Sequence, residues 1–377
     1  MTSADTGVAP TTRGPRGTSR TRRATGTHAM DIRVPDTRAA DPASPVGPAA
    51  SPVGPLSSPM GPPALRELAE ALRERMGRVV VGKTEAIDTL LATFLAGGHL
   101  LIEDVPGVAK TTLALALARC LDLSSARIQF TADLLPADVT GVSVYDQATR
   151  EFRFHPGPVF AGVVVADEIN RATPRTQSAL LEAMGEGQVS VEGRALPLPD
   201  PFIVVATQNP LEMEGTFALP EAQRDRFMTR MTMGYPDADA EAALLLARGA
   251  ADPLADLAPI ASEPDARAAR AAVAALHLDP AVARYIVALV SATRDNAAIA
   301  LGASPRAGLH LAAVARARAA MAGRGFVSPD DVARAGVDVL AHRLIPAGHH
   351  ASAADALAAS TRALRHIIAD MPVPTGE

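Results

Sequence analysis

The spacing of hydrophobic positions changes twice along this chain and divides it into three parts. Before residue 62 large apolar side chains are sparse, and Pro, Ser, Thr, Gly and Arg dominate. Such a segment cannot bury enough apolar surface to offset the entropy lost on ordering. From there to about residue 236 strand-like and helical patterns alternate, and beyond it only helical spacing is convincing. We therefore predict a disordered tail at 1–62, an α/β core at 63–236 and a helical domain at 237–377.

Two helices open the predicted core, and strands and helices then alternate. Leucines spaced for one helical face fill 64–76, and a second helical pattern over 84–98 ends at two glycines. Short apolar runs predict buried strands at 99–103, 162–168 and 201–209, a strand piece at 152–154, and helices at 110–121 and 174–187. This alternation predicts a parallel sheet sandwiched by helices.

The last third of the chain is rich in alanine and leucine. Amphipathic helical patterns cover 282–295 and 304–323, and the second of these has Ser304 placed as N-cap and Pro305 as first helical residue. No convincing strand pattern follows Tyr235. The second domain is therefore predicted to be all helical.

Composition narrows the class of protein. Hydrophobic residues make up 48% of the 377 residues, enough for sizeable cores, and the net charge is −5. The pattern contains no apolar leader, and no apolar run reaches the roughly 18 residues of a membrane span. With one cysteine and histidines in no metal-binding spacing, the sequence predicts a cytoplasmic protein that is neither membrane-inserted nor zinc-dependent. The mild acidity argues against nucleic acid as the main partner.

Two stretches end in lysine and threonine, as phosphate-binding loops do. Residues 77–84 read GRVVVGKT and match G-x-x-x-x-G-K-[ST] at every position, whereas residues 104–111 read DVPGVAKT and lack both glycines. A phosphate loop needs a strand before it and a helix after it. The first stretch follows a helix, and its three valines resist tight turns, while the second follows the predicted 99–103 strand. We therefore predict that 104–111 binds the phosphates and that 77–84 is a linker.

Within 104–111 several residues have a predicted task. Pro106 and Gly107 supply the turn, Lys110 is placed for the β- and γ-phosphates, and the Thr111 hydroxyl is placed for Mg²⁺. Asp104 and Ala109 stand where the pattern has glycine. Ala109 adds one methyl group, which is tolerable if its φ stays negative, and Asp104 brings a carboxylate near the start of the loop.

Further polar residues follow the other two buried strands. Asp167 and Glu168 end the 162–168 strand, where α/β sheets hold their ligands. We predict that Asp167 holds Mg²⁺ through water and that Glu168 orients and deprotonates an attacking water. Asn209, at the tip of the next strand, is predicted to position that water near the γ-phosphate.

Three arginines are candidates for contacts with the γ-phosphate. Arg224 and Arg226 lie beyond the last predicted strand of the core, where either could reach a neighbouring subunit's site as an arginine finger. Arg306 lies in the first turn of the 304–323 helix, where the helix dipole disfavours a cation. That position suggests a nearby anion, such as a nucleotide held beneath a lid.

Four long segments of the chain resemble MoxR-type AAA+ ATPases. They read RIQFTADLLPADVTG at 127–141, ADEINRATPRTQSALLEAMGEGQVSVEG at 166–193, ATQNPLEMEGTFALPEAQRDRF at 206–227 and GASPRAGLHL at 302–311. The likeness covers roughly residues 64–345. It implies an α/β AAA+ P-loop core, a parallel sheet flanked by helices, followed by an all-helical lid domain. It also implies a hairpin within 131–158 that faces a ring pore.

The resemblance assigns roles by position. Lys110 and Thr111 would belong to the Walker A motif, and Asp167 and Glu168 to the Walker B motif. Asn209 would be sensor 1 and Arg306 would be sensor 2. Arg226 would be the arginine finger that acts in trans, although the neighbouring Arg224 leaves the identity of the finger open. The implied nucleotide contacts are Val81, Gly82, Val105, Pro106, Gly107, Val108, Ala109, Lys110, Thr111 and Thr112, with Thr111 and Asp167 holding the metal. The segment VVVGK at 79–83 would line the adenine pocket.

The implied function is that of a Mg·ATP-hydrolysing, ring-forming chaperone. Such rings are usually hexamers that remodel or mature client proteins, often beside a partner with a von Willebrand A domain. Two other interpretations stay open: a nucleic-acid motor of the helicase or chelatase branch, and a scaffold that binds nucleotide without hydrolysing it. Lys110→Ala is expected to abolish ATP binding, and Lys83→Ala to matter little because Lys83 is expected to be solvated.

Overall fold

The computed structural model describes residues 60–209, 216–239, 241–242 and 254–374. The predicted tail lies outside these ranges as far as residue 59. Met60 is buried, and α1 (Pro62–Gly77) starts two residues later with prolines at its first positions. At three- and four-residue spacing α1 buries Leu65, Ala69, Leu72 and Met76. The predicted first helix is therefore confirmed.

A linker, 78–83, joins α1 to a second helix, α2 (Thr84–Leu95). Val80 of this linker is buried, and Gly82 turns the chain with a φ of 73°. The stretch that matches the phosphate-loop pattern at every position thus connects two helices, as predicted.

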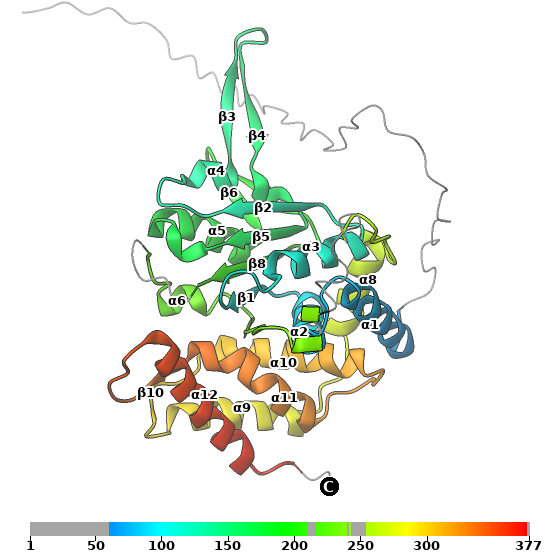
Figure 1. The fold of residues 1–377 in the computed structure, drawn as a ribbon, viewed down its shortest axis with the longest axis vertical. Coiled ribbons are helices and arrows are strands. Elements are labelled where there is room, and N and C mark those ends of the chain that lie inside the picture. Colours follow the sequence, from blue (N-terminus) through cyan, green and yellow to red (C-terminus); the bar gives the residue numbers. More distant parts are fainter. Residues whose placement is uncertain (1–59, 210–215, 240, 243–253, 375–377) are drawn as a thin grey trace, which may run out of the picture. The chain divides into compact units, whose positions relative to one another are not determined.

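Five parallel strands form the central sheet (Figure 1). They are β1 (Leu100–Glu103), β2 (Ser125–Gln129), β5 (Val163–Asp167), β8 (Ile203–Gln208) and β9 (Thr229–Met231). Their spatial order is β2-β5-β8-β1-β9, and every neighbouring pair is parallel. All five carboxyl ends therefore lie along one edge, and the predicted parallel sheet is confirmed.

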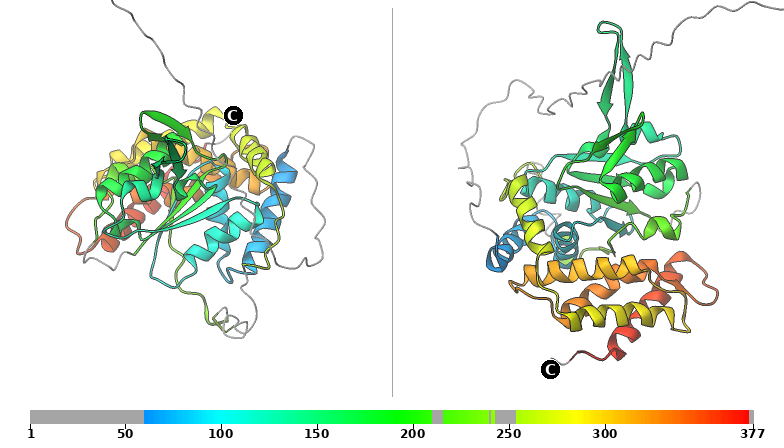
Figure 2. Two further views of the ribbon diagram at one scale, coloured as in Figure 1. Left: turned by 90° about the horizontal axis from the view of Figure 1, so that it is seen from above. Right: turned by 180° about the vertical axis from the view of Figure 1, so that it is seen from behind.

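Alternate side chains of the strands enter two hydrophobic cores. Leu100 and Ile102 of β1 pack in the same core as α1, α2 and α3 (Lys110–Cys120), whereas Leu101 packs in the core that contains α5 (Pro174–Glu186). The same alternation places Val163 and Val165 on one face of β5 and Val164 on the other. Helices therefore cover both faces of the sheet (Figures 1 and 2).

Cys120, the chain's single cysteine, is the last residue of α3 and is fully buried. Its carbonyl accepts the N–H groups of Ile260 and Ala261, from the segment just before α8 (Glu263–Ala274). Burial raises the pKa of the Cys120 thiol to about 11. The side chain is thus a protonated, apolar packing residue at neutral pH.

Two antiparallel hairpins lie outside the parallel sheet. The first pairs β3 (Gly141–Asp146) with β4 (Glu151–Pro156), follows the short helix α4 (Pro136–Thr140) and extends away from the sheet (Figure 1). The second pairs β6 (Gln188–Val191) with β7 (Arg194–Pro197). The strand piece predicted at 152–154 is real, but it belongs to a hairpin within 131–158, where the family resemblance implies one.

Helices dominate the chain after the sheet. The short α6 (Glu221–Arg224) precedes β9, and α8, α9 (Pro280–Arg294), α10 (Pro305–Met321), α11 (Pro329–Leu340) and α12 (Ala353–Asp370) follow it. Single 3₁₀ turns occupy η1 (Pro158–Phe160), η2 (Ile169–Arg171) and η3 (Ala341–Arg343). Ser304 caps α10 by accepting the Ala307 N–H, as predicted. Among the described residues, no helix combines the length and apolar character needed to cross a bilayer.

The prediction that no strand follows Tyr235 is wrong. The strands β10 (Ile299–Leu301) and β11 (Ile345–Pro346) pair antiparallel within the helical region. Each has only two or three residues, which is too short for an alternating pattern to show in the sequence. This small ladder joins the loop before α10 to the loop before α12.

Candidate nucleotide site

The predicted site residues converge at the carboxyl edge of the sheet. Three adjacent strands, β5, β8 and β1, are each followed by predicted residues. Asp167 ends β5 and Glu168 follows it, Asn209 follows β8, and Asp104 follows β1. Asp104, Asp167 and Asn209 are all buried. The topology thus brings the strand-end residues together where α/β folds hold ligands.

Residues 104–109 connect β1 to α3 and pass twice through left-handed backbone. Gly107 has a φ of 86° and Ala109 a φ of 63°. Ala109 therefore does not have the negative φ at which its methyl group was expected to be tolerated. The chain must turn from strand to helix within a few residues, and Ala109 takes the left-handed conformation at the N-cap of α3, at a cost of roughly 1 kcal/mol for its methyl group. Glycine at the same place in the usual pattern avoids that cost.

The amino end of α3 has the form of an anion site. Ala109, its N-cap, makes no side-chain cap, so the first N–H groups of this eleven-residue helix are directed out of its first turn. Lys110 opens the helix, and its ammonium donates to the Asp104 carbonyl at 2.7 Å. The ammonium thus reaches back across the loop made by Val105, Pro106, Gly107 and Val108, while Thr111 and Thr112 continue the first turn.

The Asp104 carboxylate is held by backbone N–H groups. Oδ1 accepts from Val105 at 2.8 Å, and Oδ2 accepts from Met233 and Gly234, each at 2.6 Å. These three donors stabilise the negative charge of a buried side chain. The carboxylate expected near the start of the loop is present, and its hydrogen bonds go to the loop itself and to the chain after β9.

A hydroxyl and a carboxylate suited to Mg²⁺ meet below the loop. The Thr111 hydroxyl lies 3.3 Å from Asp167 Oδ2 and 3.4 Å from Oδ1. Thr207 donates to Asp167 Oδ1 at 3.2 Å, and Arg127 donates to Oδ2 at 2.6 Å, so the carboxylate is fixed in orientation. Oxygen donors of this kind fit Mg²⁺, which takes one or two protein ligands and completes its shell with water and phosphate. Consistent with that, the described ranges contain no group of three or more His, Cys, Asp or Glu side chains placed to bind a metal alone.

Glu168 is positioned by three neighbours at the end of β5. Its backbone is left-handed, with a φ of 57°, and its N–H donates to the Thr207 hydroxyl at 3.0 Å. Its Oε2 accepts from Gln129 at 2.9 Å and from Arg171 at 2.8 Å. A non-glycine residue in this conformation costs energy that the surrounding hydrogen bonds must offset. The Glu168 side chain, which lies next to the Thr111–Asp167 pair, is therefore held in one place.

Lys83 is half-buried and hydrogen-bonded within the chain, whereas the sequence predicted a solvated side chain. Its ammonium donates to the carbonyls of Met233 at 2.8 Å and Tyr235 at 2.6 Å. These acceptors are 150 and 152 positions away in the chain, so the sequence offers no local sign of them. Through Lys83, the linker that carries Val81 and Gly82 is tied to the residues that Asp104 also holds.

The two finger candidates lie on either side of Asp225: Arg224 is the last residue of α6, and Arg226 follows the helix. Arg226 donates to the Leu181 carbonyl on α5. Arg224 lies 3.9 Å from Glu221, a weak pairing within one turn. The structure thus gives Arg226 a definite place against α5.

Arg306 has an anionic neighbour within its own chain. Its Nη1 lies 3.9 Å from Asp225 Oδ2, and its side chain is 56% exposed. Ser304, the cap of α10, donates to both oxygens of Asp225 at 3.2 and 3.3 Å. The position of Arg306 at a helix amino end suggested a nearby anion, and in the structure that anion is Asp225. Because the Arg306 guanidinium is exposed, a second anion has room to bind it.

The Asp225 carboxylate also faces a buried arginine. Arg343 Nη1 lies 3.5 Å from Asp225 Oδ1. Burial lowers the pKa of Arg343 to about 10, and Asp225 opposes that shift, so the guanidinium stays charged at neutral pH. Burial and the nearby Arg343 and Arg306 lower the pKa of His310 to about 3, so this histidine is neutral. Asp225 therefore links the core to the lid helices through three side chains.

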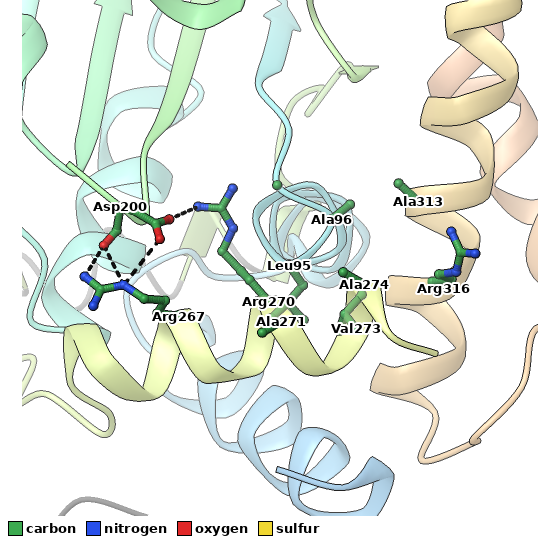
Figure 3. Close-up of a pocket in the computed structure, with 11 residues that line it drawn as sticks. Leu95, Ala96, Asp200, Arg267, Arg270, Ala271, Val273, Ala274, Ala313 and Arg316 are labelled. Atoms are coloured by element: carbon green, nitrogen blue, oxygen red, sulfur yellow. Dashed lines mark hydrogen bonds and ion pairs between the residues drawn. The ribbon is translucent and has the colours of Figure 1, made fainter. Parts of the chain in front are cut away.

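A second cavity, of about 400 Å³, lies at the opposite edge of the sheet. Gly97 precedes β1 and Asp200 precedes β8, so both mark the amino ends of the strands. Arg267 and Arg270 of α8 reach Asp200 (Figure 3). Arg316 of α10 donates to the Leu276 carbonyl. Because parallel sheets bind ligands at their carboxyl ends, this cavity is distinct from the phosphate loop.

Sequence reasoning missed the residues that orient the two acids. Arg127 and Gln129 come from β2, whose register sets Gln129 beside Asp167. The strand has only one buried residue, Ile128, so it shows no apolar run. The sequence did offer one sign of an edge strand: the apolar Ile128 lies between two polar residues, Arg127 and Gln129. Thr207, on β8, was hidden within a run that reads as apolar.

Comparisons with known proteins agree with this geometry. The family model for the ATPase family associated with various cellular activities (AAA) matches residues 99–229, and the AAA lid domain model matches residues 291–364. YeaC of Bacillus subtilis is 46% identical over 72% of this chain and 85% of its own length, and Chaperone MoxR1 of Mycobacterium tuberculosis is 43% identical over 71% and 73%. A crystal structure of a candidate ATPase from Cytophaga hutchinsonii matches with a TM-score of 0.75 at 35% identity, over 83% of this chain and 97% of that one. The chain belongs to the MoxR family of AAA ATPases.

Proposed function

We propose that this protein hydrolyses Mg·ATP at the carboxyl edge of its sheet and uses the reaction to remodel client protein complexes. The observation that carries the first part is the meeting of Thr111 with Asp167 at 3.3 Å, directly beside Glu168. A phosphate loop, a metal-binding pair and a fixed carboxylate at one sheet edge are the parts that phosphoryl transfer to water requires. ATP binding itself is what membership of the AAA family implies.

Each residue of the site has a step in the proposed reaction. Lys110 and the amino end of α3 bind the phosphates, and Thr111 and Asp167 hold Mg²⁺, which offsets the charge that develops on them. Glu168, kept in place by Gln129 and Arg171, accepts a proton from the attacking water. Asn209, buried at the end of β8, orients that water. Arg306 then reports the γ-phosphate to the lid.

We assign the finger to Arg226 and the assembly to a ring, by preference a hexamer. A finger acting in trans makes each site complete only at a subunit boundary, which explains why one chain shows Arg226 away from the phosphate loop and against Leu181. Arg224, two residues earlier, is the competing candidate. The cytoplasm, which supplies ATP, is the compartment that this activity needs.

The hairpin formed by β3 and β4 is our candidate client-contact element. Val142, Val144, Tyr145 and Phe152 are each about half exposed there, at 49%, 48%, 49% and 57%. Apolar side chains left in water on a projecting element are typical of binding surfaces. One relative is named a chaperone, MoxR1, which supports a remodelling role. A partner with a von Willebrand A domain is part of the same proposal.

The decisive test is Glu168→Gln. This variant should bind Mg·ATP as wild type does and hydrolyse it about a hundredfold more slowly, because the proton acceptor is lost. Its control is Glu70→Gln, which breaks a comparable ion pair with Arg66 at 2.7 Å but lies on the exposed face of α1, away from the site. Equal turnover by Glu168→Gln and wild type would contradict the proposal. A pull-down with Glu168→Gln in ATP should then retain the client.

The finger is tested by mixing two inactive variants. Lys110→Met subunits bind ATP only weakly but still carry Arg226, and Arg226→Ala subunits bind ATP but lack the finger. If the finger acts in trans, mixed rings regain part of the ATPase activity, since one subunit completes its neighbour's site. The same mixture with Arg224→Ala in place of Arg226→Ala identifies the arginine. Mixtures as inactive as their components would exclude a trans finger at that position.

A further inference from the structure

The chain leaves the sheet through a short connector, Met233–Tyr235, which runs from β9 toward the lid helices. In the β1–β9 ladder Ile102 lies opposite Met231, so Asp104 and Met233, two residues further on, leave the sheet at the same level. The Asp104 N–H still donates to Gln208 of β8, at 3.1 Å. On the β9 side its carboxylate, rather than its backbone, accepts hydrogen bonds from the connector's N–H groups. Asp104 thus continues the sheet's hydrogen bonding where the ladder ends.

Lys83 binds the same connector through the connector's own carbonyl groups. The ammonium reaches Met233 and Tyr235, while Gly234 between them adopts a φ of 63° that glycine tolerates without strain. An anion therefore holds the N–H groups and a cation holds the carbonyl groups. All four contacts are 2.6 to 2.8 Å long, as expected for charge-assisted hydrogen bonds.

Lysine is rare in this chain, which makes its two positions informative. Of 36 Lys and Arg residues, only Lys83 and Lys110 are lysine. An ammonium is compact and donates in three directions, which suits converging carbonyl or phosphate oxygens, whereas the planar guanidinium suits carboxylates. Both lysines donate to backbone carbonyls, and Asp104 stands between them: its carbonyl accepts Lys110 and its carboxylate holds the connector that Lys83 also holds.

We propose that Asp104 and Lys83 are positioning residues that couple the phosphate loop to the lid through the connector. The inference rests on the proposed nucleotide site. A phosphate in the loop competes with the Asp104 carbonyl for the Lys110 ammonium, so filling the loop changes the hydrogen bonding of the residue that holds Met233 and Gly234. The connector continues from β9, and β9 packs against the lid helix α11, so a displacement of the connector reaches the lid.

The two lysines allow this coupling to be measured directly. Trace acylation of the full chain with isotope-labelled acetic anhydride, read by mass spectrometry, reports on Lys83 and Lys110 separately. Asp104→Asn places an amide donor against the connector's N–H groups and should raise Lys83 acylation at least about fivefold, because Lys83 loses its acceptors. Arg78→Met is the control, since Arg78 lies in the same linker and pairs only with Glu74 in the described structure. Unchanged Lys83 acylation in Asp104→Asn would overturn the proposal.

Mg·ADP then separates coupling from simple packing. In wild type it should protect Lys110 and change Lys83 acylation about threefold or more, and in Asp104→Asn only the Lys110 protection should persist. Protection of Lys110 with no change at Lys83 in wild type would overturn the coupling and leave the proposed function standing. If Mg·ADP does not protect Lys110 in wild type, both the coupling and the proposed function are overturned.

Turnover gives the second readout. Lys83→Met should keep ATP affinity within about threefold of wild type and lower kcat about tenfold, since phosphate binding belongs to Lys110 and lid closure depends on the connector. A purely structural contact would lower the melting temperature and leave kcat unchanged, and that result would overturn the proposal. Arg78→Met should leave both quantities unchanged.

Discussion

Gly82 and Ala109 occupy the same position in two stretches of chain, directly before a lysine, a threonine and a helix. Both residues are left-handed, with φ values of 73° and 63°. The two lysines differ in what surrounds them. Lys110 comes after a strand and donates to the Asp104 carbonyl at the sheet's carboxyl edge, whereas Lys83 comes after a helix and holds the connector. A short pattern thus describes a local turn, and the preceding element decides whether the turn meets a phosphate.

The largest contrast is expected between the lysines themselves. Lys110→Met should weaken ATP binding about a hundredfold, because it removes a charged contact to the phosphates. Lys83→Met should change the affinity no more than about threefold. Titration with a fluorescent ATP analogue measures both constants, and melting curves show that each variant is folded. Equal losses in the two variants would erase the distinction between the stretches.

The threonines that follow give the next contrast. Thr111→Val removes the hydroxyl 3.3 Å from Asp167 and should raise the Mg²⁺ concentration needed for half-maximal ATPase activity about tenfold. Thr84→Val makes the same change at an exposed position at the start of α2 and should leave the Mg²⁺ dependence unchanged. A Mg²⁺ titration of the steady-state rate checks both. A similar response from the two variants would remove Thr111 from the metal site.

The left-handed residues should show the smallest effects, of opposite sign. Gly82→Ala introduces a methyl group where φ is positive and should lower the free energy of unfolding by about 1 kcal/mol. Ala109→Gly relieves the same strain and should raise it by about 0.5 kcal/mol, part of the gain being lost to the greater entropy of unfolded glycine. Urea unfolding of both variants against wild type measures the pair. Stabilisation by Gly82→Ala would contradict the shared geometry.

Strand-end reasoning predicted the centre of the site. The 104–111 loop, the acids 167 and 168 and Asn209 follow buried strands whose apolar runs are visible in sequence, and parallel pairing forces their carboxyl ends to one edge. The partners of Lys83 could not be predicted, because they are backbone carbonyls about 150 residues away. Arg127 and Gln129 were missed since an edge strand carries little apolar periodicity. Ala109 has a positive φ because the chain must turn sharply into α3, and this requirement outweighs the preference of alanine for a negative φ.

The buried thiol at the end of α3 makes the protein its own reporter of local opening. Cys120 closes the helix that Lys110 begins, and its carbonyl accepts the N–H groups of Ile260 and Ala261. A thiol reagent reacts only when this end of the helix opens, and with one cysteine in the chain the reaction has a single phase to follow. Nucleotide bound at the proposed site, at the other end of α3, should stabilise the closed form increasingly as its concentration rises above its dissociation constant. The rate of Cys120 modification therefore reports how much a bound ligand stabilises α3, without any added label.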